Sequence, residues 1–217
     1  MFKIFTTIIA LAVLSGCGVM KPMPIADVDL SELKGKSLLK TKTEMPDMME
    51  LTVGRGFFGA FGMLAGISAG NELVKNNNIQ DPAQMISLKL AKEFAKKNKL
   101  KLNVKSTLVE TNDVKKISDQ NSKVDYILDI RTQNWNLAYF PFDMSAFRVN
   151  YLAHLRLIDT KTKMVIAESQ CHRVVEESEG APTHDQMVAN NMKLFKSETQ
   201  KAINYCVKEF KKTTLRI

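Results

Sequence analysis

Apolar and polar residues alternate most regularly in the second half of the chain. Residues 147–159 read FRVNYLAHLRLID, where apolar side chains occupy every second position from Phe147 to Leu157. Strict alternation of this length predicts an antiparallel strand with one buried and one solvent-facing side. The polar turn DTKTK at residues 159–163 then predicts a hairpin with a returning strand over residues 164–175.

Three other stretches also indicate strands. In VDYILDIRT, residues 124–132, the apolar residues share one face, and residues 100–109 alternate in part. Residues 37–43, SLLKTKT, form a weaker candidate for a first strand.

Helical spacing predicts two long helices and one short helix. Asp81 is a suitable N-cap and Pro82 a suitable first helical residue, for a helix that runs to about Asn98. A short helix is expected over residues 114–121 and a long closing helix over 185–212. The apolar positions of the closing helix are Val188, Met192, Phe195, Thr199, Ala202, Cys206 and Phe210. Their spacing of three and four residues suits a helix that lies on a sheet.

These elements predict an α+β fold, with an antiparallel sheet of about four strands and two long helices packed on it. The expected organisation is a signal peptide at 1–16, a tether at 17–50, a glycine-rich apolar segment at 51–78 and a periplasmic domain at 79–217.

The N-terminus is typical of a secreted lipoprotein. One lysine precedes an apolar run and a small-residue cleavage region, which indicates a signal peptide. The tetrapeptide LSGC, residues 14–17, resembles the bacterial lipobox, which implies acylation of Cys17 and anchoring by acyl chains. Gly18 follows the cysteine where aspartate retains such proteins at the inner membrane, so the resemblance implies the outer membrane, on its periplasmic face.

The charge balance changes the picture only slightly. The chain has 31 basic and 23 acidic residues, and loss of Lys3 with the leader leaves 30 against 23, a formal charge of +7. The lysines are scattered along helix faces, which does not favour nucleic-acid binding. In the periplasm this excess is better suited to anionic headgroups, acidic glycans or an acidic protein.

Two cysteines remain after the lipidated one. Cys171 lies on the predicted returning strand and Cys206 lies in the apolar stripe of the closing helix. In an oxidising compartment this arrangement predicts a disulfide between them.

The glycine-rich stretch VGRGFFGAFGMLAGISAG, residues 53–70, has several interpretations. Residues 54–59 match GxGxxG, but no long strand precedes them, so we reject a dinucleotide site. Gly62, Gly66 and Gly70 would share one smooth face of a helix too short to span a bilayer. We expect a packing helix, against another copy or its own domain; a flexible loop remains the alternative.

Four aromatic residues surround a proline between the two longest predicted strands: Trp135, Tyr139, Phe140 and Phe142. In a loop they would form a tip that binds a partner or touches the membrane. The alternative is that Trp135 and Phe140 fold back over the core.

No arrangement of residues indicates catalysis. His154, His172 and His184 have no metal-ligand spacing, and no serine lies in a nucleophile-elbow pattern. We therefore expect a protein that is not an enzyme, without a metal or cofactor.

Residues 124–132 and the hairpin LRLIDTKTKMVIAES resemble periplasmic lipoprotein domains, among them the curli-secretion lipoprotein and the activator lipoproteins of penicillin-binding proteins. The resemblance covers residues 79–212 in outline and implies an α+β domain without enzymatic activity. Lys163 stands where the family has a turn glycine, and the returning strand lacks the family's tryptophan.

The sequence thus predicts an accessory or scaffolding lipoprotein that hangs from the outer membrane and binds an envelope protein. The alternative is a subunit of a membrane-associated oligomer or secretion assembly that packs through the glycine-rich segment.

Overall fold

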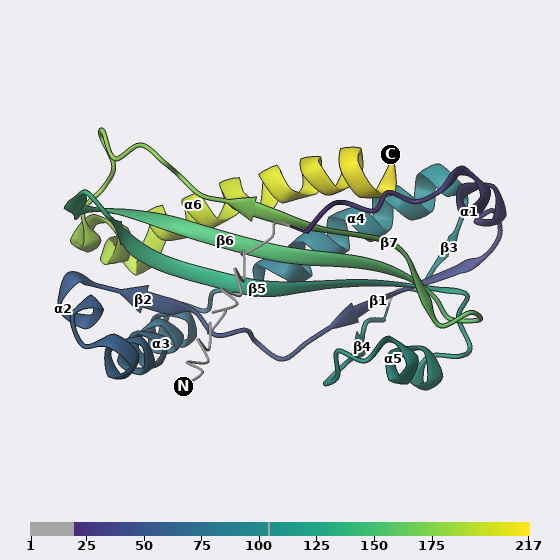
Figure 1. Ribbon diagram of the computed structural model, residues 1–217, viewed down its shortest axis with the longest axis horizontal. Coiled ribbons are helices and arrows are strands. Elements are labelled where there is room, and N and C mark those ends of the chain that lie inside the picture. Colours follow the sequence, from purple (N-terminus) through teal and green to yellow (C-terminus); the bar gives the residue numbers. More distant parts are fainter. Residues whose placement is uncertain (1–19, 104) are drawn as a thin grey trace, which may run out of the picture.

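The computed structural model describes residues 20–103 and 105–217. The helices are α1 (Asp27–Glu32), α2 (Val53–Gly56), α3 (Gly59–Asn76), α4 (Pro82–Asn98), α5 (Val114–Gln120) and α6 (His184–Phe210), which continues as the π-helix η1 (Lys211–Leu215). The strands are β1 (Ser37–Lys42), β2 (Met49–Leu51), β3 (Lys101–Leu102), β4 (Thr107–Leu108), β5 (Tyr126–Phe140), β6 (Asp143–Asp159) and β7 (Met164–Arg173). Figure 1 shows their arrangement.

The sheet differs from the prediction. It has seven strands and is mixed, in the order β3-β1-β5-β6-β7, with β2 on β5 and β4 on β1. The expected sheet of about four antiparallel strands with two long helices is therefore wrong. The antiparallel part, β5-β6-β7, carried a strong alternation signal, whereas β2, β3 and β4 are only two or three residues long. Alternation also says nothing of pairing direction, and β1 and β2 pair with β5 in parallel.

Strand β5 is the centre of the sheet. One edge pairs with β6 along almost its whole length, and the other edge is divided between two strands. There β1 pairs with the start of β5 around Leu128, and β2 pairs with its far end around Leu137. Parallel neighbours need a crossover connection, which the chain supplies through α3 and α4.

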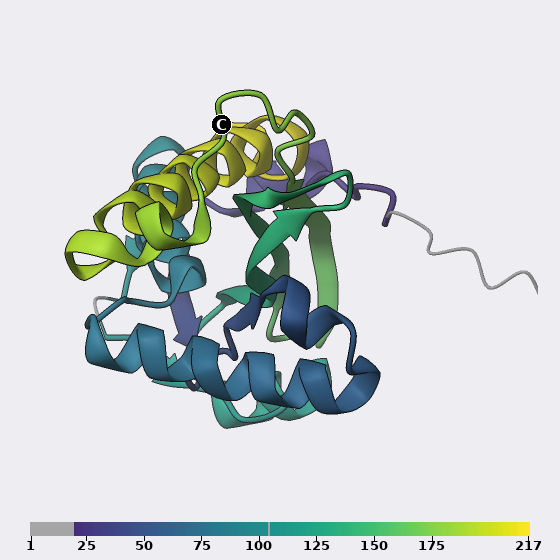
Figure 2. The same cartoon turned by 90° about the vertical axis from the view of Figure 1, so that its left-hand side faces the viewer.

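The two faces of the sheet are covered differently. Helices α4 and α6 pack on one face and enclose the main core (Figure 2). On the other face, α5 covers only a small second core that includes Ile117, Ile127 and Ile158. The rest of that face carries polar side chains, among them Arg131 and His154.

Local sequence signals account for the long helices. The Asp81 carboxylate accepts a hydrogen bond from the Ala83 backbone N–H at 2.9 Å and thereby caps α4 as predicted. Thr183 and Gln186 form a capping box at the start of α6. Non-helical backbone at residues 189–192 interrupts α6 after its first turn, a kink that the apolar spacing alone does not predict.

Much of residues 17–50, the segment expected to be a tether, is part of the fold. The backbone of Met23 pairs with that of Glu168 in β7, and the Ile25 N–H donates to the Thr214 carbonyl oxygen at 2.9 Å. Residues 27–51 then supply α1, β1 and β2. Residues 23–51 therefore belong to the described fold, and the division at residue 79 separates elements that share one sheet.

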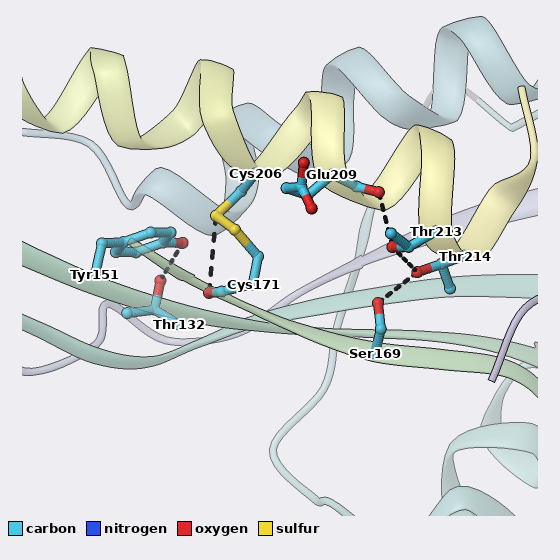
Figure 3. The surroundings of a disulfide bond; sticks show 8 residues. All are labelled: Thr132, Tyr151, Ser169, Cys171, Cys206, Glu209, Thr213 and Thr214. Atoms are coloured by element: carbon cyan, nitrogen blue, oxygen red, sulfur yellow. Dashed lines mark hydrogen bonds between the residues drawn. A yellow bond between two sulfur atoms is a disulfide. The ribbon is translucent and has the colours of Figure 1, made fainter. Parts of the chain in front are cut away.

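The predicted disulfide between Cys171 and Cys206 is confirmed (Figure 3). It joins β7 to α6, with a Cα–Cα distance of 5.5 Å, and both residues are buried. The buried hydroxyls of Ser169 and Thr214 hydrogen-bond to each other nearby, so a second link joins β7 to η1.

Candidate interaction surface

The aromatic segment that was expected to be a loop is instead the end of β5. Trp135, Tyr139 and Phe140 lie within this strand, and β6 follows after only two residues. Trp135 is buried with its ring centroid 5.8 Å from that of Phe195 in α6. Phe140 is also buried, with the Arg148 guanidinium 4.7 Å above its ring. This segment is therefore the end of a strand and not the expected loop. Asn134 and Asn136 interrupt the alternation of apolar residues, so the predicted strand stopped too early.

Among the four aromatic residues of this segment, Phe142 in the hairpin turn is the one that is fully exposed to solvent. Phe142 is 103% exposed, and Met144 beside it is about half exposed at 50%. The turn lies between two strands, and the rings of Phe140 on one strand and Phe147 on the other are buried. Phe142 is therefore an apolar contact on a well-supported hairpin rather than part of an aromatic cluster.

The glycine-rich segment forms α2 and α3, and its smooth face covers the chain's own strand β2. Gly62, Gly66 and Gly70 are all buried. A Cβ atom at Gly66 would lie 2.8 Å from the Glu50 carbonyl oxygen, and Cβ atoms at the other two glycines would overlap main-chain atoms of Arg55 and Met48. The three glycines thus share one face, as their spacing predicts, because helix and strand backbones approach closely there.

The opposite face of this segment is apolar and uncovered. Phe57, Phe58, Phe61 and Leu64 are between 66% and 83% exposed, and Met63 is 53% exposed. No charged residue occurs from Gly56 to Asn71. We call these five side chains the α2–α3 apolar surface. Isolated exposed apolar residues are ordinary, but five of them within residues 57–64 are typical of a contact surface.

A polar cluster fastens α2 and the start of α6 to β2. The buried Glu50 carboxylate forms an ion pair with Arg55, and its Oε1 lies 2.6 Å from His184 Nε2. These groups line a shallow hollow of about 420 Å³ whose rim is Phe58 and Phe61. Glu50 and His184 are 134 residues apart, and no sequence pattern connects them.

A second cluster lies on the polar face of the sheet. Asp129 is buried and accepts hydrogen bonds from Arg156 at 2.5 and 3.1 Å, from Arg131 at 3.0 Å and from the Thr41 hydroxyl at 2.6 Å. Burial raises the pKa of Asp129. The two guanidinium groups and the hydrogen bonds lower it by more than burial raises it, so the pKa of Asp129 lies below its usual range. Asp129 is therefore an ionised, fully engaged carboxylate.

These arginines line a hollow of about 760 Å³. Its walls also carry the carboxylates of Glu44 and Glu110 and the imidazole of His154. His154 Nε2 lies 2.7 Å from the Glu168 carboxylate. Burial lowers the pKa of His154, and the contact with Glu168 opposes that shift only in part. Mixed charges and internally paired arginines favour a structural network over an anion site.

Among residues 20–103 and 105–217 there is no group of three or more histidine, cysteine or acidic residues that could hold a metal ion. No helix in the same part of the chain is long and apolar enough to cross a membrane. Cys17, the predicted lipidation site, lies outside the described residues.

Comparisons with known proteins give no assignment. No protein-family model matches the sequence, and no curated protein is significantly similar to it.

Solved structures that resemble it do so remotely. The PelC dodecamer from Paraburkholderia phytofirmans is 10% identical with a TM-score of 0.31, covering 78% of this chain and 85% of that one. Lipoprotein GNA1162 from Neisseria meningitidis is 12% identical with a TM-score of 0.29, covering 78% and 99%. A putative neuraminyllactose-binding hemagglutinin homolog from Helicobacter pylori is 14% identical with a TM-score of 0.34, covering 82% and 88%. At these values the likeness supports no conclusion about function.

Proposed function

We propose that this chain is a lipid-anchored accessory lipoprotein of the cell envelope that binds a protein partner at the periplasmic face of the outer membrane. The anchor is Cys17 in the LSGC motif, followed by the outer-membrane-type Gly18. Several acyl chains give stable attachment where a single chain would be marginal.

The observation that carries the binding role is the exposed turn at the end of the β5–β6 hairpin. Phe142 has no neighbour that shields it, while the rings on either side of the turn are buried. Aromatic side chains presented on a rigid support are frequent anchors of protein interfaces, because they bury a large area at little entropic cost. Met144 on the same turn adds an adaptable apolar contact.

Site-specific photo-crosslinking in living cells tests this role. A photoreactive residue at Phe142 should capture a discrete envelope protein. The same residue at Met164, an exposed apolar position on the β6–β7 turn at the other end of the sheet, should not. Equal labelling at both positions, or none at Phe142, would contradict binding through this turn.

Fractionation tests the anchor separately. Cys17→Ser should leave an unprocessed precursor at the inner membrane, because the lipobox cysteine is the acylation site. Normal maturation and outer-membrane recovery of that variant would refute the anchor.

The oligomer alternative needs a surface other than the glycine face. Gly66 and Gly70 face the main chain of Glu50 and Met48, and Gly62 faces that of Arg55 in α2, so this face is not free to meet a second copy.

A further inference from the structure

We propose that the α2–α3 apolar surface lies on the lipid bilayer, as a second membrane contact besides the acyl anchor. This inference rests on the proposed anchoring through Cys17. The occupant is the interfacial region of a bilayer, where phenylalanine and leucine side chains enter among the acyl chains without crossing.

The first argument is that this surface cannot turn inward. Phe57, Phe61 and Leu64 are more than 65% exposed, while the glycine face of the same helix is fixed on β2. Rotating α3 would place bulky side chains against the carbonyl groups of residues 48–50, where only glycine fits. The apolar face is therefore permanently directed outward, so whatever covers it comes from outside the described fold.

The second argument is the short distance between the anchor and the fold. Met23 is already hydrogen-bonded to Glu168, with 2.7 Å from the Met23 N to the Glu168 O. Five residues lie between Met23 and Cys17, and the six residue steps from one to the other span at most about 20 Å. The bilayer surface must therefore lie within about 20 Å of the middle of β7, which makes lipid a constant neighbour of this side of the molecule.

The third argument is that the α2–α3 connection turns on the side of the molecule from which the first described residues leave the fold (Figure 2). Across the sheet the two contacts lie at different edges, since Met23 pairs with β7 and β2 pairs with the far edge of β5. Along the sheet the two are well separated: Glu168 pairs with Arg156, which pairs with Asp129, whereas β2 pairs with β5 at Ala138. Nine residues of strand correspond to about 30 Å.

The two contacts together define an orientation. With the anchor near the middle of β7 and the apolar surface about 30 Å along the sheet, the long axis of the sheet lies along the bilayer. Anchoring also holds the surface at a high effective concentration of lipid at all times. A second copy must instead be met by diffusion, and for that reason lipid is the favoured occupant.

Lipid-phase quenching of a probe tests the contact directly. The lipidated protein is reconstituted in phosphatidylethanolamine–phosphatidylglycerol vesicles that contain brominated lipids. A single cysteine, Phe61→Cys, carries a polarity-sensitive fluorophore; the native Cys171 and Cys206 are joined to each other and do not react. Leu88→Cys is the matched control, because Leu88 is also an exposed apolar residue but lies on α4. This helix packs on β1 and β5, away from the side where the first described residues leave the fold (Figure 2).

We expect a blue-shifted emission and quenching at residue 61 at least about twofold stronger than at residue 88. Leu64→Cys, on the same surface, should behave like Phe61→Cys and guards against a local defect at one position. Equal, water-like emission at residues 61, 64 and 88 would overturn the inference. So would a signal at residue 61 that is blue-shifted without lipid quenching, or that disappears below one protein per vesicle, because both identify a second copy as the occupant.

Mass spectrometry of the same sample separates the two proposals. Absence of acyl chains on Cys17 would refute the proposed anchor, while quenching at residue 61 by added vesicles would still support the apolar surface. Acylated protein without quenching at residue 61 would refute the surface and leave the anchor intact.

Discussion

Gly70 lies directly against the main chain of Met48, so that a Cβ atom at Gly70 would overlap the Met48 carbonyl oxygen. This contact explains why a run of glycines occurs in an 18-residue helix, where each glycine would otherwise cost about 1 kcal/mol relative to alanine. The helix backbone therefore lies close to residues 48–50, and the Asn71 side chain adds a hydrogen bond from the Met48 N–H.

Gly70→Ala should therefore destabilise the protein despite the higher helix propensity of alanine. The added methyl group must displace main-chain atoms, and we expect a loss of about 2 kcal/mol in the free energy of unfolding. Urea denaturation measures it. Gly54→Ala in α2 is the control, since nothing lies within 4 Å of its Cβ position and its stability should be unchanged or slightly higher. Equal midpoints for the two variants would contradict this account.

Removal of the disulfide should cost much of the stability. Cys171 and Cys206 close a loop with a sequence separation of 35 residues. In the chain-entropy model such a loop stabilises by roughly 3–4 kcal/mol. The double variant Cys171→Ala, Cys206→Ala should unfold at a correspondingly lower urea concentration. A reducing agent should lower the midpoint of the native chain and leave that of the double variant unchanged; a shift in both would refute this explanation.

Arg156→Met should be among the most damaging single substitutions. It leaves the buried Asp129 carboxylate with Arg131 as its one remaining guanidinium partner. Breaking one side of a buried ion pair costs about 3–5 kcal/mol. Lys201→Met, which removes an exposed partner of Glu198, is the control and should cost less than about 1 kcal/mol. Similar effects of the two substitutions on thermal or urea unfolding would argue against a structural role for Asp129.

Acidification should destabilise the native chain through His154. Burial lowers the pKa of His154 in the folded state below its unfolded value of about 6.5. The unfolded state therefore binds more protons between these two values, and the free energy of unfolding falls as the pH drops through about 6.5. His154→Gln should weaken this dependence between pH 7.5 and 5. His172→Gln, at an exposed histidine of β7, is the control; a native-like pH slope in both variants would exclude His154 as the cause.

The regular alternation of β6 and β7 and the capping residues of α4 made these elements predictable from the sequence. The short strands were not, because Met49–Leu51 is too brief to show a period. Lys163 is instructive: it has φ +57° at the turn position where the resembling family has glycine, so a missing glycine did not mean a missing turn.

The candidate surfaces were predicted less well, for a physical reason. Helical spacing identifies which residues share a face, as for Gly62, Gly66 and Gly70, but not what that face contacts. Likewise, Trp135 and Phe140 look the same in sequence whether they lie in a loop or in a buried strand end. Side-chain contacts such as that of Glu50 with His184 form only when the tertiary fold brings distant residues together.

The hydrogen bonds of residues 23–25 also decide how the molecule carries mechanical load. A pull on an acyl anchor at Cys17 enters the fold at Met23, which is bonded to Glu168, and then at Ile25, which is bonded to Thr214 and to Arg216. The disulfide ties β7 to α6, close to both receiving segments. If Cys17 carries the proposed acyl anchor, a pull from the membrane would reach a strand and a helix that the disulfide links covalently, before it reaches the hairpin that carries Phe142.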